Sequence, residues 1–251
     1  MNQKTAIITG ASRGLGRDMA INLAKEGIDI IFSYHSNQIK ANELIQEIEA
    51  IGQKAVAFQF DANDFTSGNR FIEKATAYLK AENGKSGFEF LINNAGTGAY
   101  NLIANTTEAQ FDEMMHVHMK SVYFLTQAAL PHLKEGGRII NISSGLARFS
   151  LPGMSAYAMM KGGIEIFTRY LAKELGDRQI TANVIAPGAI ATDFAGGSNR
   201  EDDKQALIAS ITALGRVGEA DDIGGVVAFL CSDKAAWING QRIEVSGGML
   251  V

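Results

Sequence analysis

Short apolar runs alternate along the chain with longer segments in which apolar residues recur every three or four positions. The short runs are rich in Ile, Val and Phe, which is typical of strands buried in a parallel sheet. The longer segments have the spacing of amphipathic helices. The expected strands are 5–9, 28–33, 54–60, 88–92, 138–144, 180–186 and 242–245. The expected helices are 18–26, 39–51, 65–79, 106–132, 157–175 and 221–231.

This alternation runs through the whole chain without a Pro-rich linker, a composition break or an internal repeat. It predicts a single α/β domain over residues 1–251, built as a doubly wound parallel sheet (Rossmann fold) of about seven strands with helices on both faces. Residues 194–203 are small, polar and glycine-containing. We expect a substrate-site flap over 194–213, with a plain surface linker as the alternative.

Composition narrows the classes of function. Hydrophobic residues make up 46% of the chain, charged residues 20%, and the net charge is −4, so bulk charge recruits neither nucleic acid nor a membrane surface. The single cysteine, Cys231, and four scattered histidines offer no disulfide and no metal-ligand spacing. No apolar run approaches the ~18 residues of a membrane helix, and no basic-then-apolar leader opens the sequence. We expect a cytoplasmic enzyme or binding protein.

A glycine-rich turn separates the first expected strand from the first expected helix. Gly10 permits the tight turn, Gly14 lets backbone approach a ligand, and Gly16 lets the helix pack close to the sheet. The helix N-terminus then offers N–H groups to a pyrophosphate. The pattern predicts a dinucleotide site, and the alternative is a glycine turn that binds nothing.

The end of the second strand bears on which dinucleotide binds. An acidic residue there would accept hydrogen bonds from a ribose 2′-hydroxyl and repel a 2′-phosphate. The sequence instead continues through His35 and Ser36 without a carboxylate, and Arg13 in the glycine turn is the nearest candidate cation. NADP(H) is therefore favoured, NAD(H) is the alternative, and His35 also fits a plain surface loop.

A tyrosine and a lysine lie four residues apart in the segment 155–161. If this segment is helical, Tyr157 and Lys161 project from one face, one turn apart. A phenol beside an ammonium can act as an acid or a base, because the positive charge favours phenolate and lowers the phenol pKa. Tyrosine and lysine also occur at this spacing in helices by chance. Whether the pair is catalytic therefore has to be judged from the motifs around it.

Six motifs occur in chain order on the expected elements. They are Thr9-Gly10-(three)-Gly14-Leu15-Gly16, Asp61, Asn93-Asn94-Ala95-Gly96, Ser144, Tyr157-(three)-Lys161 and Pro187-Gly188. With them the chain resembles the short-chain dehydrogenase/reductase family over nearly its whole length. Within that family it is most similar to the 3-oxoacyl-[acyl-carrier-protein] reductase-like group, through the Thr-Gly-Ala-Ser-Arg-Gly start and the Gly-Arg-Ile-Ile-Asn-Ile-Ser-Ser strand.

The resemblance implies catalytic roles. Tyr157 would be the general acid that protonates a carbonyl oxygen, or the base in the reverse direction. Lys161 would lower the pKa of Tyr157 and hold the nicotinamide ribose. Ser144, thirteen residues before Tyr157, would hydrogen-bond the substrate oxygen. Its neighbour Ser143 faces the other side of the strand and is expected to be structural.

The resemblance also implies cofactor contacts. Asp61 would hold the adenine amino group, Asn94 would contact the cofactor near the centre of the sheet, and Ile190 and Thr192 would meet the nicotinamide carboxamide. The complete expected cofactor set is Gly10, Ser12, Arg13, Gly14, Leu15, Gly16, His35, Ser36, Asp61, Ala62, Asn94, Ala95, Gly96, Tyr157, Lys161, Pro187, Gly188, Ile190 and Thr192.

One position departs from the family pattern. Relatives carry an asparagine in the helix after the Asn-Ala-Gly strand, where it completes a catalytic tetrad, and here that position is His118. A histidine can keep a water relay running and can titrate near neutrality, which would make activity pH-dependent. The alternative is an interior histidine that contributes only to stability. Ser246 is a smaller departure, at a position where many relatives have Asp.

The expected function is NADPH-dependent reduction of a small ketone or a 3-oxoacyl thioester, so acyl-carrier-protein or CoA thioesters are candidate partners. The alternatives are a non-catalytic NADP(H)-binding sensor or scaffold, an NAD-preferring alcohol dehydrogenase of the same fold, and an epimerase or dehydratase. We expect the segments after Gly96 and Ser144 and the flap to determine which substrate binds. The resemblance implies a homotetramer, while Trp237 and Met249 could equally complete a monomer core.

Overall fold

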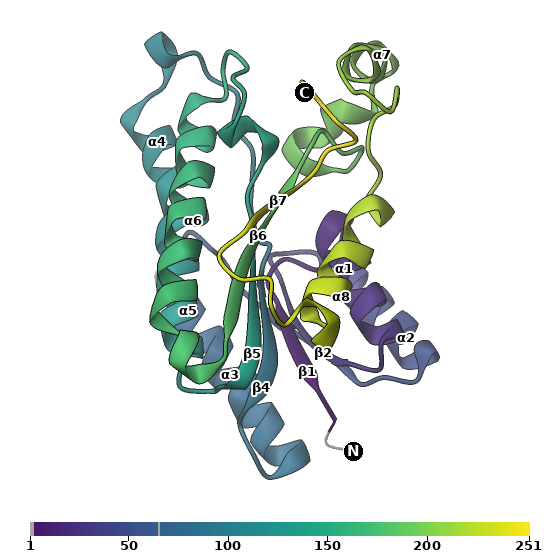
Figure 1. The fold of residues 1–251 in the computed structure, drawn as a ribbon, viewed down its shortest axis with the longest axis vertical. Helices are drawn as coiled ribbons and strands as arrows, with labels where there is room; N and C mark the ends of the chain where they lie inside the picture. The colour runs from purple at the N-terminus through teal and green to yellow at the C-terminus, as the bar shows by residue number, and fades with distance from the viewer. Residues whose placement is uncertain (1–2, 65) are drawn as a thin grey trace.

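The sheet of this computed structural model is entirely parallel within the described residues, which are 3–64 and 66–251. Its strand order is β3-β2-β1-β4-β5-β6-β7 (Figure 1). Each crossover between neighbouring strands carries a helix, as parallel strands require. The strands are β1 (Thr5–Ile8), β2 (Asp29–Tyr34), β3 (Ala55–Gln59), β4 (Phe88–Asn93), β5 (Leu133–Ile142), β6 (Thr181–Pro187) and β7 (Arg242–Val245).

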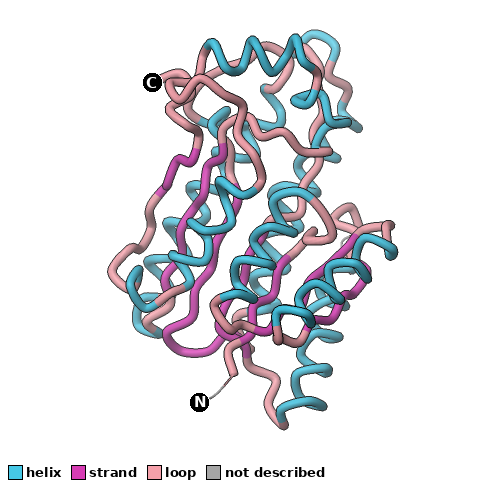
Figure 2. The backbone as a smooth tube through the Cα atoms, turned by 90° about the vertical axis from the view of Figure 1, so that its right-hand side faces the viewer, coloured by secondary structure: helices cyan, strands magenta, loops and turns pink. Residues whose placement is uncertain are grey.

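Helices cover both faces of this sheet, which confirms the doubly wound Rossmann prediction (Figure 2). One face packs against α1, α2 and α8, and the other against α3, α5 and α6. The α-helices are α1 (Gly14–Lys25), α2 (Gln38–Ile51), α3 (Ser67–Asn83), α4 (Glu108–Met115), α5 (Ser121–Ala129), α6 (Ser155–Glu174), α7 (Asp202–Ser210) and α8 (Asp221–Cys231). Successive residues of each inner strand alternate between the cores, as Ile7 and Ile8 do.

The order of the strands reverses direction at β1, which pairs with β2 on one side and β4 on the other. In open α/β sheets, ligands bind beyond the carboxyl ends of the strands at such a reversal. The carboxyl ends here point towards the end of the molecule that carries α4 and α7 (Figure 1). The glycine turn, the Asn-Asn-Ala-Gly segment and the two serines all follow strands at this end.

The structure corrects several element boundaries. The helix expected over 106–132 is divided by a π-helical turn, His116–Lys120, between α4 and α5. Strand β5 begins at Leu133 rather than 138, because Phe88 pairs with Leu133 before a shift in register. Gly136 lies inside β5 at φ +73°. The expected start of the third helix, at residue 65, lies outside the described residues.

Helix α7 was not expected from the sequence. Only Ile208 of this helix is buried, so its nine residues show no apolar stripe to signal a helix. Two aspartates in its first turn favour the helix through the N-terminal dipole instead. No helix in the described part of the chain is both long and apolar enough to cross a bilayer. The same residues contain no group of three or more His, Cys, Asp or Glu arranged to hold a metal ion.

Candidate active site

The glycine turn between β1 and α1 has a backbone that only glycine fits well. Gly10 and Gly14 have φ values of +66° and +56°, in the left-handed region. A Cβ on Gly16 would lie 2.5 Å from both the Gly10 carbonyl oxygen and the Asn94 side-chain nitrogen. Helix α1 then begins without an acidic residue in its first turn and without a side-chain cap from Arg13. Its first N–H groups therefore suit an anion such as a pyrophosphate.

Asn94 holds the shape of this turn. Its Nδ2 donates to the carbonyl oxygens of Thr9 (2.9 Å) and Gly10 (3.0 Å). In return, Thr9 Oγ1 accepts from the backbone N–H groups of Asn94 and Ala95, both at 3.0 Å. The Asn94 amide is thus directed at the turn, and a contact of this residue with the cofactor stays a prediction.

Three residues of the expected cofactor set use their side chains for packing. Leu15 packs against the core on the α1 side, while Ala62 and Ala95 pack against the core on the α3 side. All three side chains are partly buried by this packing. Ser12, in contrast, is buried within the glycine turn itself.

The ends of β2 and β3 bring His35 and Asp61 together. His35 Nε2 lies 3.8 Å from Asp61 Oδ2, and both side chains are exposed. Asp61 Oδ1 also accepts from the Asn63 backbone N–H at 2.9 Å. Ser36 is exposed beside His35. Ser33, near the end of β2, accepts from the Gly10 N–H through Oγ at 2.9 Å, which fixes this strand end against the glycine turn.

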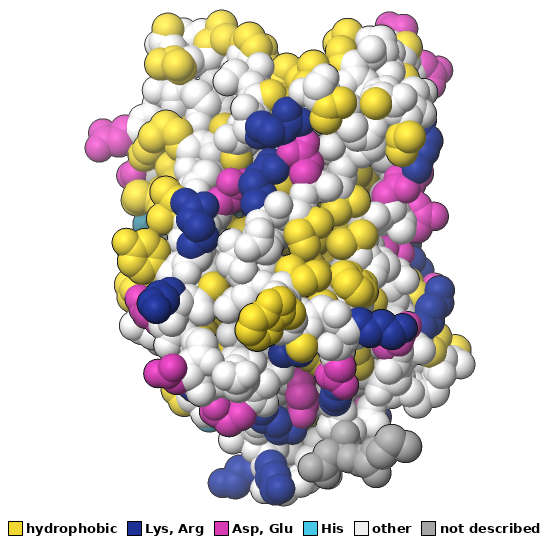
Figure 3. All heavy atoms as spheres, in the orientation of Figure 1, with side chains coloured by type: hydrophobic (Ala, Val, Ile, Leu, Met, Phe, Trp, Pro, Cys, Tyr) yellow, Lys and Arg dark blue, Asp and Glu magenta, His cyan; other side chains and the backbone are white. Residues whose placement is uncertain are grey.

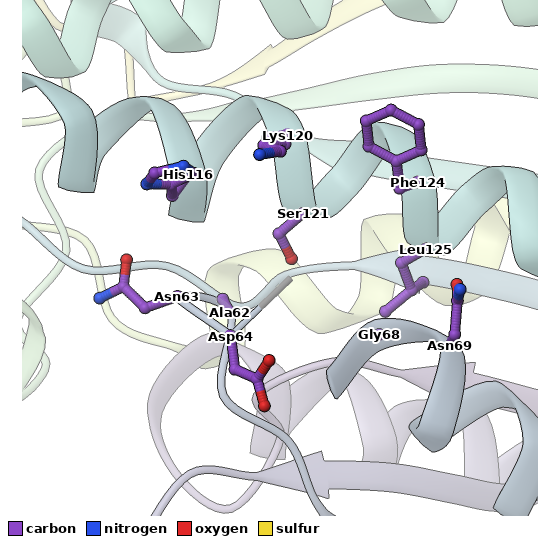
Figure 4. Close-up of a pocket in the computed structure, with 10 residues that line it drawn as sticks. All are labelled: Ala62, Asn63, Asp64, Gly68, Asn69, His116, Lys120, Ser121, Phe124 and Leu125. Carbon is purple, nitrogen blue, oxygen red and sulfur yellow. The ribbon is translucent and has the colours of Figure 1, made fainter. Parts of the chain in front are cut away.

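A shallow pocket adjoins this corner (Figure 4). It lies between the segment after β3, the start of α3, and the π-turn with the start of α5. Of the expected site residues only Ala62 lines it, and the catalytic candidates do not. The polar side chains of Asn63, Asp64, His116 and Lys120 surround it (Figure 4). The pocket marks the outer edge of the expected adenine region.

The segment after β6 reaches back to the glycine turn. A Cβ on Gly14 would lie 3.6 Å from Thr192 Cβ, so the end of β6 and the start of α1 are neighbours. Gly188 is needed because a Cβ there would lie 2.9 Å from the Ser246 Cα atom. Ile190 and Thr192 are buried. The structure thus brings the residues expected at the nicotinamide close to those expected at the pyrophosphate.

Ser144, Tyr157 and Lys161 come together at the end of β5 and the start of α6. The Ser144 hydroxyl lies close enough to the Tyr157 phenol to favour its ionised form. The ammonium of Lys161 lies 5.5 Å from the centroid of the Tyr157 ring, and Nζ donates to the Ile142 carbonyl oxygen at 2.7 Å. Tyr157 is 8% exposed and Lys161 is 5% exposed. The three residues therefore form one compact, largely dehydrated group.

Burial sets the protonation of this group. Removal from water raises the pKa of Tyr157 above its ordinary value, and the nearby Ser144 hydroxyl acts in the opposite direction. Burial lowers the pKa of the Lys161 ammonium to about 8. The net shift of the Tyr157 pKa is therefore upward, where a lowering by Lys161 was expected, because the loss of hydration of the buried phenol is the largest effect.

His118 lies in the π-helical turn and is 1% exposed. Its Nε2 lies 2.7 Å from the Thr97 carbonyl oxygen, which places the ring proton on Nε2. Nδ1 is buried and has no hydrogen-bond partner among the described residues. A Cβ on Gly96 would lie 2.9 Å from the ring, so Gly96 is the residue that leaves space for it.

The environment of His118 excludes a charge at neutral pH. Burial lowers the pKa of His118 to about 3, the positive charge of Lys161 acts in the same direction, and the hydrogen bond with Thr97 opposes them. The expectation that His118 titrates near neutrality is therefore wrong. The sequence showed which residue occupies the tetrad position but not that the ring is enclosed beside a cation.

A network of charged side chains holds the backbone of Ser144 in place. Ser143, as expected, has a structural role: its hydroxyl donates to Glu165 Oε1 at 2.8 Å. The same carboxylate oxygen accepts from Arg242 Nε at 2.7 Å, and Arg242 Nη2 donates to the Ser144 carbonyl oxygen at 3.3 Å. Arg242 also pairs with Glu244, which lowers the pKa of that carboxyl to about 2 together with Arg148.

Sequence reasoning missed this network and a second, uncharged one in the sheet. Asn93 Nδ2 donates to Asn141 Oδ1 at 2.8 Å, and Asn141 Nδ2 donates to Thr168 Oγ1 at 2.8 Å. All three residues are buried. The available signal was an asparagine at an otherwise apolar strand position, since a buried amide requires partners. Glu165 and Arg242 gave no comparable signal, because charged residues on a helix and an edge strand usually face water.

Three loops meet above Tyr157. The ring of Phe194, at the start of the expected flap, lies 5.9 Å from the Tyr157 ring. A Cβ on Gly98, in the loop after β4, would lie 2.9 Å from Phe194 Cε1. The same loop is joined to the loop after β5, because Asn101 N donates to the Gly153 carbonyl oxygen at 2.9 Å. The three segments expected to give substrate specificity thus meet around Tyr157, and we call the place where they meet the mouth of the site.

Comparison with known proteins supports a common architecture. A family model described as enoyl-(acyl carrier protein) reductase matches residues 10–250. An uncharacterized oxidoreductase of Methylorubrum extorquens is 37% identical over 249 residues, covering 98% of this chain and 97% of that protein. The 3-oxoacyl-[acyl-carrier-protein] reductase FabG of Staphylococcus aureus is 36% identical over 248 residues, covering 98% of both chains.

A solved structure is similar in three dimensions. The crystal structure of the angucycline C-6 ketoreductase LanV with bound NADP superposes with a TM-score of 0.94 at 36% identity. The match covers 98% of this chain and 95% of LanV. Sequence and structure therefore agree over almost the full length of the chain.

Proposed function

Because the chain belongs to the short-chain dehydrogenase/reductase family, we propose that it uses NADPH to reduce the carbonyl group of an uncharged small molecule to an alcohol. The neighbouring hydroxyl groups of Ser144 and Tyr157, with Lys161 against the Tyr157 ring, carry this proposal. Such an arrangement offers two hydroxyl groups to one acceptor oxygen. The arrangement therefore suits a substrate whose carbonyl oxygen takes up the proton.

The residues divide the chemistry of reduction between them. A bound nicotinamide supplies a hydride to the carbonyl carbon. Burial raises the pKa of Tyr157, which keeps the phenol protonated and ready to give its proton to the carbonyl oxygen. Ser144 donates to the same oxygen as negative charge develops there. Lys161 then lies near the phenolate that remains, and its ammonium stabilises that charge until solvent restores the proton.

The cofactor fits the residues present. The glycine turn leaves space that side chains would fill, and the first turn of α1 carries no acidic residue. Arg13, His35 and Ser36 would hold a 2′-phosphate, and β2 ends without a carboxylate. Asp61 is the nearest acid to His35 and lies at 3.8 Å. The NADP bound in LanV, a 36% identical structure, supports the same preference here.

The proposal is tested by following NADPH absorbance in the presence of a ketone panel, with an enoyl thioester and NADH in parallel. We expect turnover of at least one ketone, with NADPH preferred over NADH. The Tyr157→Phe variant, which keeps the ring and loses the acid, should bind NADPH and lose about 10³-fold in kcat. Tight NADPH binding by wild type without turnover of any carbonyl would identify a non-catalytic sensor instead.

We also propose that residues 194–213 act as a flap over the substrate. Phe194 at its start contacts the Tyr157 ring, and three successive residues, Ala195, Gly196 and Gly197, have positive φ values. Hinges of lids are commonly formed by such small residues. The expected result is that substrate protects this segment from proteolysis in the presence of NADPH, whereas NADPH alone protects the glycine turn.

A homotetramer is the assembly we propose. Large apolar side chains are exposed on two separate surfaces: Tyr123, Ile166 and Tyr170 on α5 and α6, and Phe229 with Trp237 around α8. Two such surfaces suit two different two-fold contacts. Light scattering should give a mass near four times 26.9 kDa, and a monomer mass would contradict the proposal.

A further inference from the structure

The three loops around the mouth differ from one another in charge. The segments 97–107 and 149–160 contain no charged residue. The segment 193–204 contains four acidic residues and two basic ones. These segments belong to one rim, because Gly98 contacts Phe194 and Asn101 is hydrogen-bonded to Gly153. The rim is therefore neutral after β4 and β5, and its third part continues from Phe194 into the acidic start of α7.

The cations near this rim are already engaged. Arg148 is the one charged residue in 145–160, and it makes two hydrogen bonds to the Glu244 carboxylate, at 2.7 and 2.8 Å. Arg148 also donates to the carbonyl oxygens of Met249 and Leu250. Arg200 is paired with Asp193, and Lys204 Nζ donates to Ser198 Oγ at 2.6 Å. This occupancy leaves the rim poorly suited to bind a phosphate.

The neutral part of the rim is apolar. Tyr100, Leu102 and Ile103 after β4 and Leu151 after β5 are exposed large apolar residues, as is Phe194 in the flap. Hydrophobic side chains lie on both sides of the notch between the α4 and α7 ends of the molecule (Figure 3). Below the rim, Met114 and Met160 pack with Tyr157, together with the partly buried Leu146 and Met154. Methionine-rich walls adapt to apolar ligands of different shape.

We propose that this site selects untethered, uncharged, apolar ketones and rejects acyl groups carried on coenzyme A or on an acidic carrier protein. The inference rests on the proposed carbonyl reduction and names its substrate class. A pantetheine arm ends in a phosphate, and coenzyme A carries further phosphates, so either carrier must place negative charge near the mouth. Glu201, Asp202 and Asp203 repel that charge, and no unengaged arginine in the described rim segments compensates.

The test compares one acyl group on carriers of different charge. Wild-type protein is assayed with NADPH on acetoacetyl-N-acetylcysteamine, acetoacetyl-CoA, an acetoacetyl carrier protein and the bicyclic ketone 2-decalone. We expect kcat/KM to be at least about tenfold lower for the two charged carriers than for the neutral thioester at low salt. The difference should shrink as salt is added, because screening weakens the repulsion. The neutral ketone should be reduced with no salt dependence.

A charge-reversal variant gives the matched control. Glu201→Lys with Asp203→Lys should raise the ratio of kcat/KM for acetoacetyl-CoA to kcat/KM for 2-decalone about tenfold. Glu26→Lys with Glu49→Lys makes the same change in net charge on exposed residues at the opposite ends of the strands, and should leave this ratio unchanged. Faster reduction of the carrier-bound substrates by wild type, weakening with salt, overturns the inference. Failure with every carbonyl overturns the proposed function itself, which is a different result.

Discussion

The ring of His118 stands edge-to-face against the ring of Tyr157, with centroids 5.0 Å apart and planes at 86°. The position that resembles the fourth member of a catalytic tetrad is therefore in direct contact with the proposed acid. The contact is between neutral groups, because burial keeps the histidine uncharged and the phenol protonated. His118 thus acts on Tyr157 by packing rather than by exchanging charge.

The burial of His118 predicts how stability depends on pH. Its folded-state pKa of about 3 lies below the ordinary histidine value of 6.5, so between these values the unfolded chain binds a proton that the folded chain does not. Stability therefore falls as the pH drops from 6.5 towards 3. From about pH 7 to pH 5 this contribution is about 2 kcal/mol. Denaturant unfolding should show a smaller loss over that range in His118→Asn than in wild type.

The His118→Asn variant also tests whether His118 titrates during catalysis or stays neutral. The limbs of the pH–kcat profile between about pH 6 and pH 9 should lie at the same pH in wild type and His118→Asn, because His118 stays neutral there. A limb that disappears with the histidine would show that the ring titrates during turnover.

The burial of Lys161 predicts how stability depends on pH in the alkaline range. Burial lowers its pKa from the ordinary lysine value of 10.5 to about 8, so between these values the unfolded chain holds more protons. Stability therefore rises as the pH increases from 8 to 10.5, by about 3 kcal/mol in total. Lys161→Met, which cannot titrate, should lack this rise while losing reductase activity. Parallel stability curves for the two proteins above pH 8 would contradict the buried charge.

The hydrogen bond from Arg242 to the backbone of Ser144 predicts that Arg242 positions Ser144 without touching the substrate. Arg242 donates to the Ser144 carbonyl oxygen and is itself held by Glu165 and Glu244. Arg242→Met should lower kcat about tenfold through a misplaced Ser144, with NADPH affinity unchanged, and Arg242→Lys should recover part of the loss. A fall in thermal stability with kcat intact would mean that the network serves only the fold.

The sequence predicted the elements best where packing was simple. Helix α8 and strand β7 have the expected bounds, because the apolar run of α8 and the alternation of charged and apolar residues in β7 both stop at polar residues. Helix α7 escaped prediction because it buries one residue, and the Leu133 start of β5 escaped because it depends on pairing with Phe88. The start of β5 is set by a partner distant in the chain, which local patterns do not contain, whereas α7 lacks the apolar stripe that such patterns detect.

In the candidate site, too, some features could be predicted from the sequence and others could not. The positions of Ser144, Tyr157 and Lys161 followed from motifs on expected elements, and the structure brings them together. The pKa values of Tyr157 and His118 did not follow, since they depend on how completely neighbouring elements remove water. Residue type and spacing predict which groups meet, whereas burial, which is a property of the whole fold, determines their charge.

Gly98 predicts the behaviour of the flap. A Cβ at this position would lie 2.8 Å from Ala195 Cβ and 2.9 Å from Phe194 Cε1, so Gly98→Ala must push the start of the flap away from the mouth. Because Phe194 packs on Tyr157, this displacement should raise KM for ketones about tenfold and leave NADPH affinity unchanged. Phe194→Ala removes the larger of the two obstacles, so adding Gly98→Ala to it should cost less than in wild type. Equal costs in the two backgrounds would show that Gly98 and Phe194 act independently, and the loop after β4 would then not control the flap.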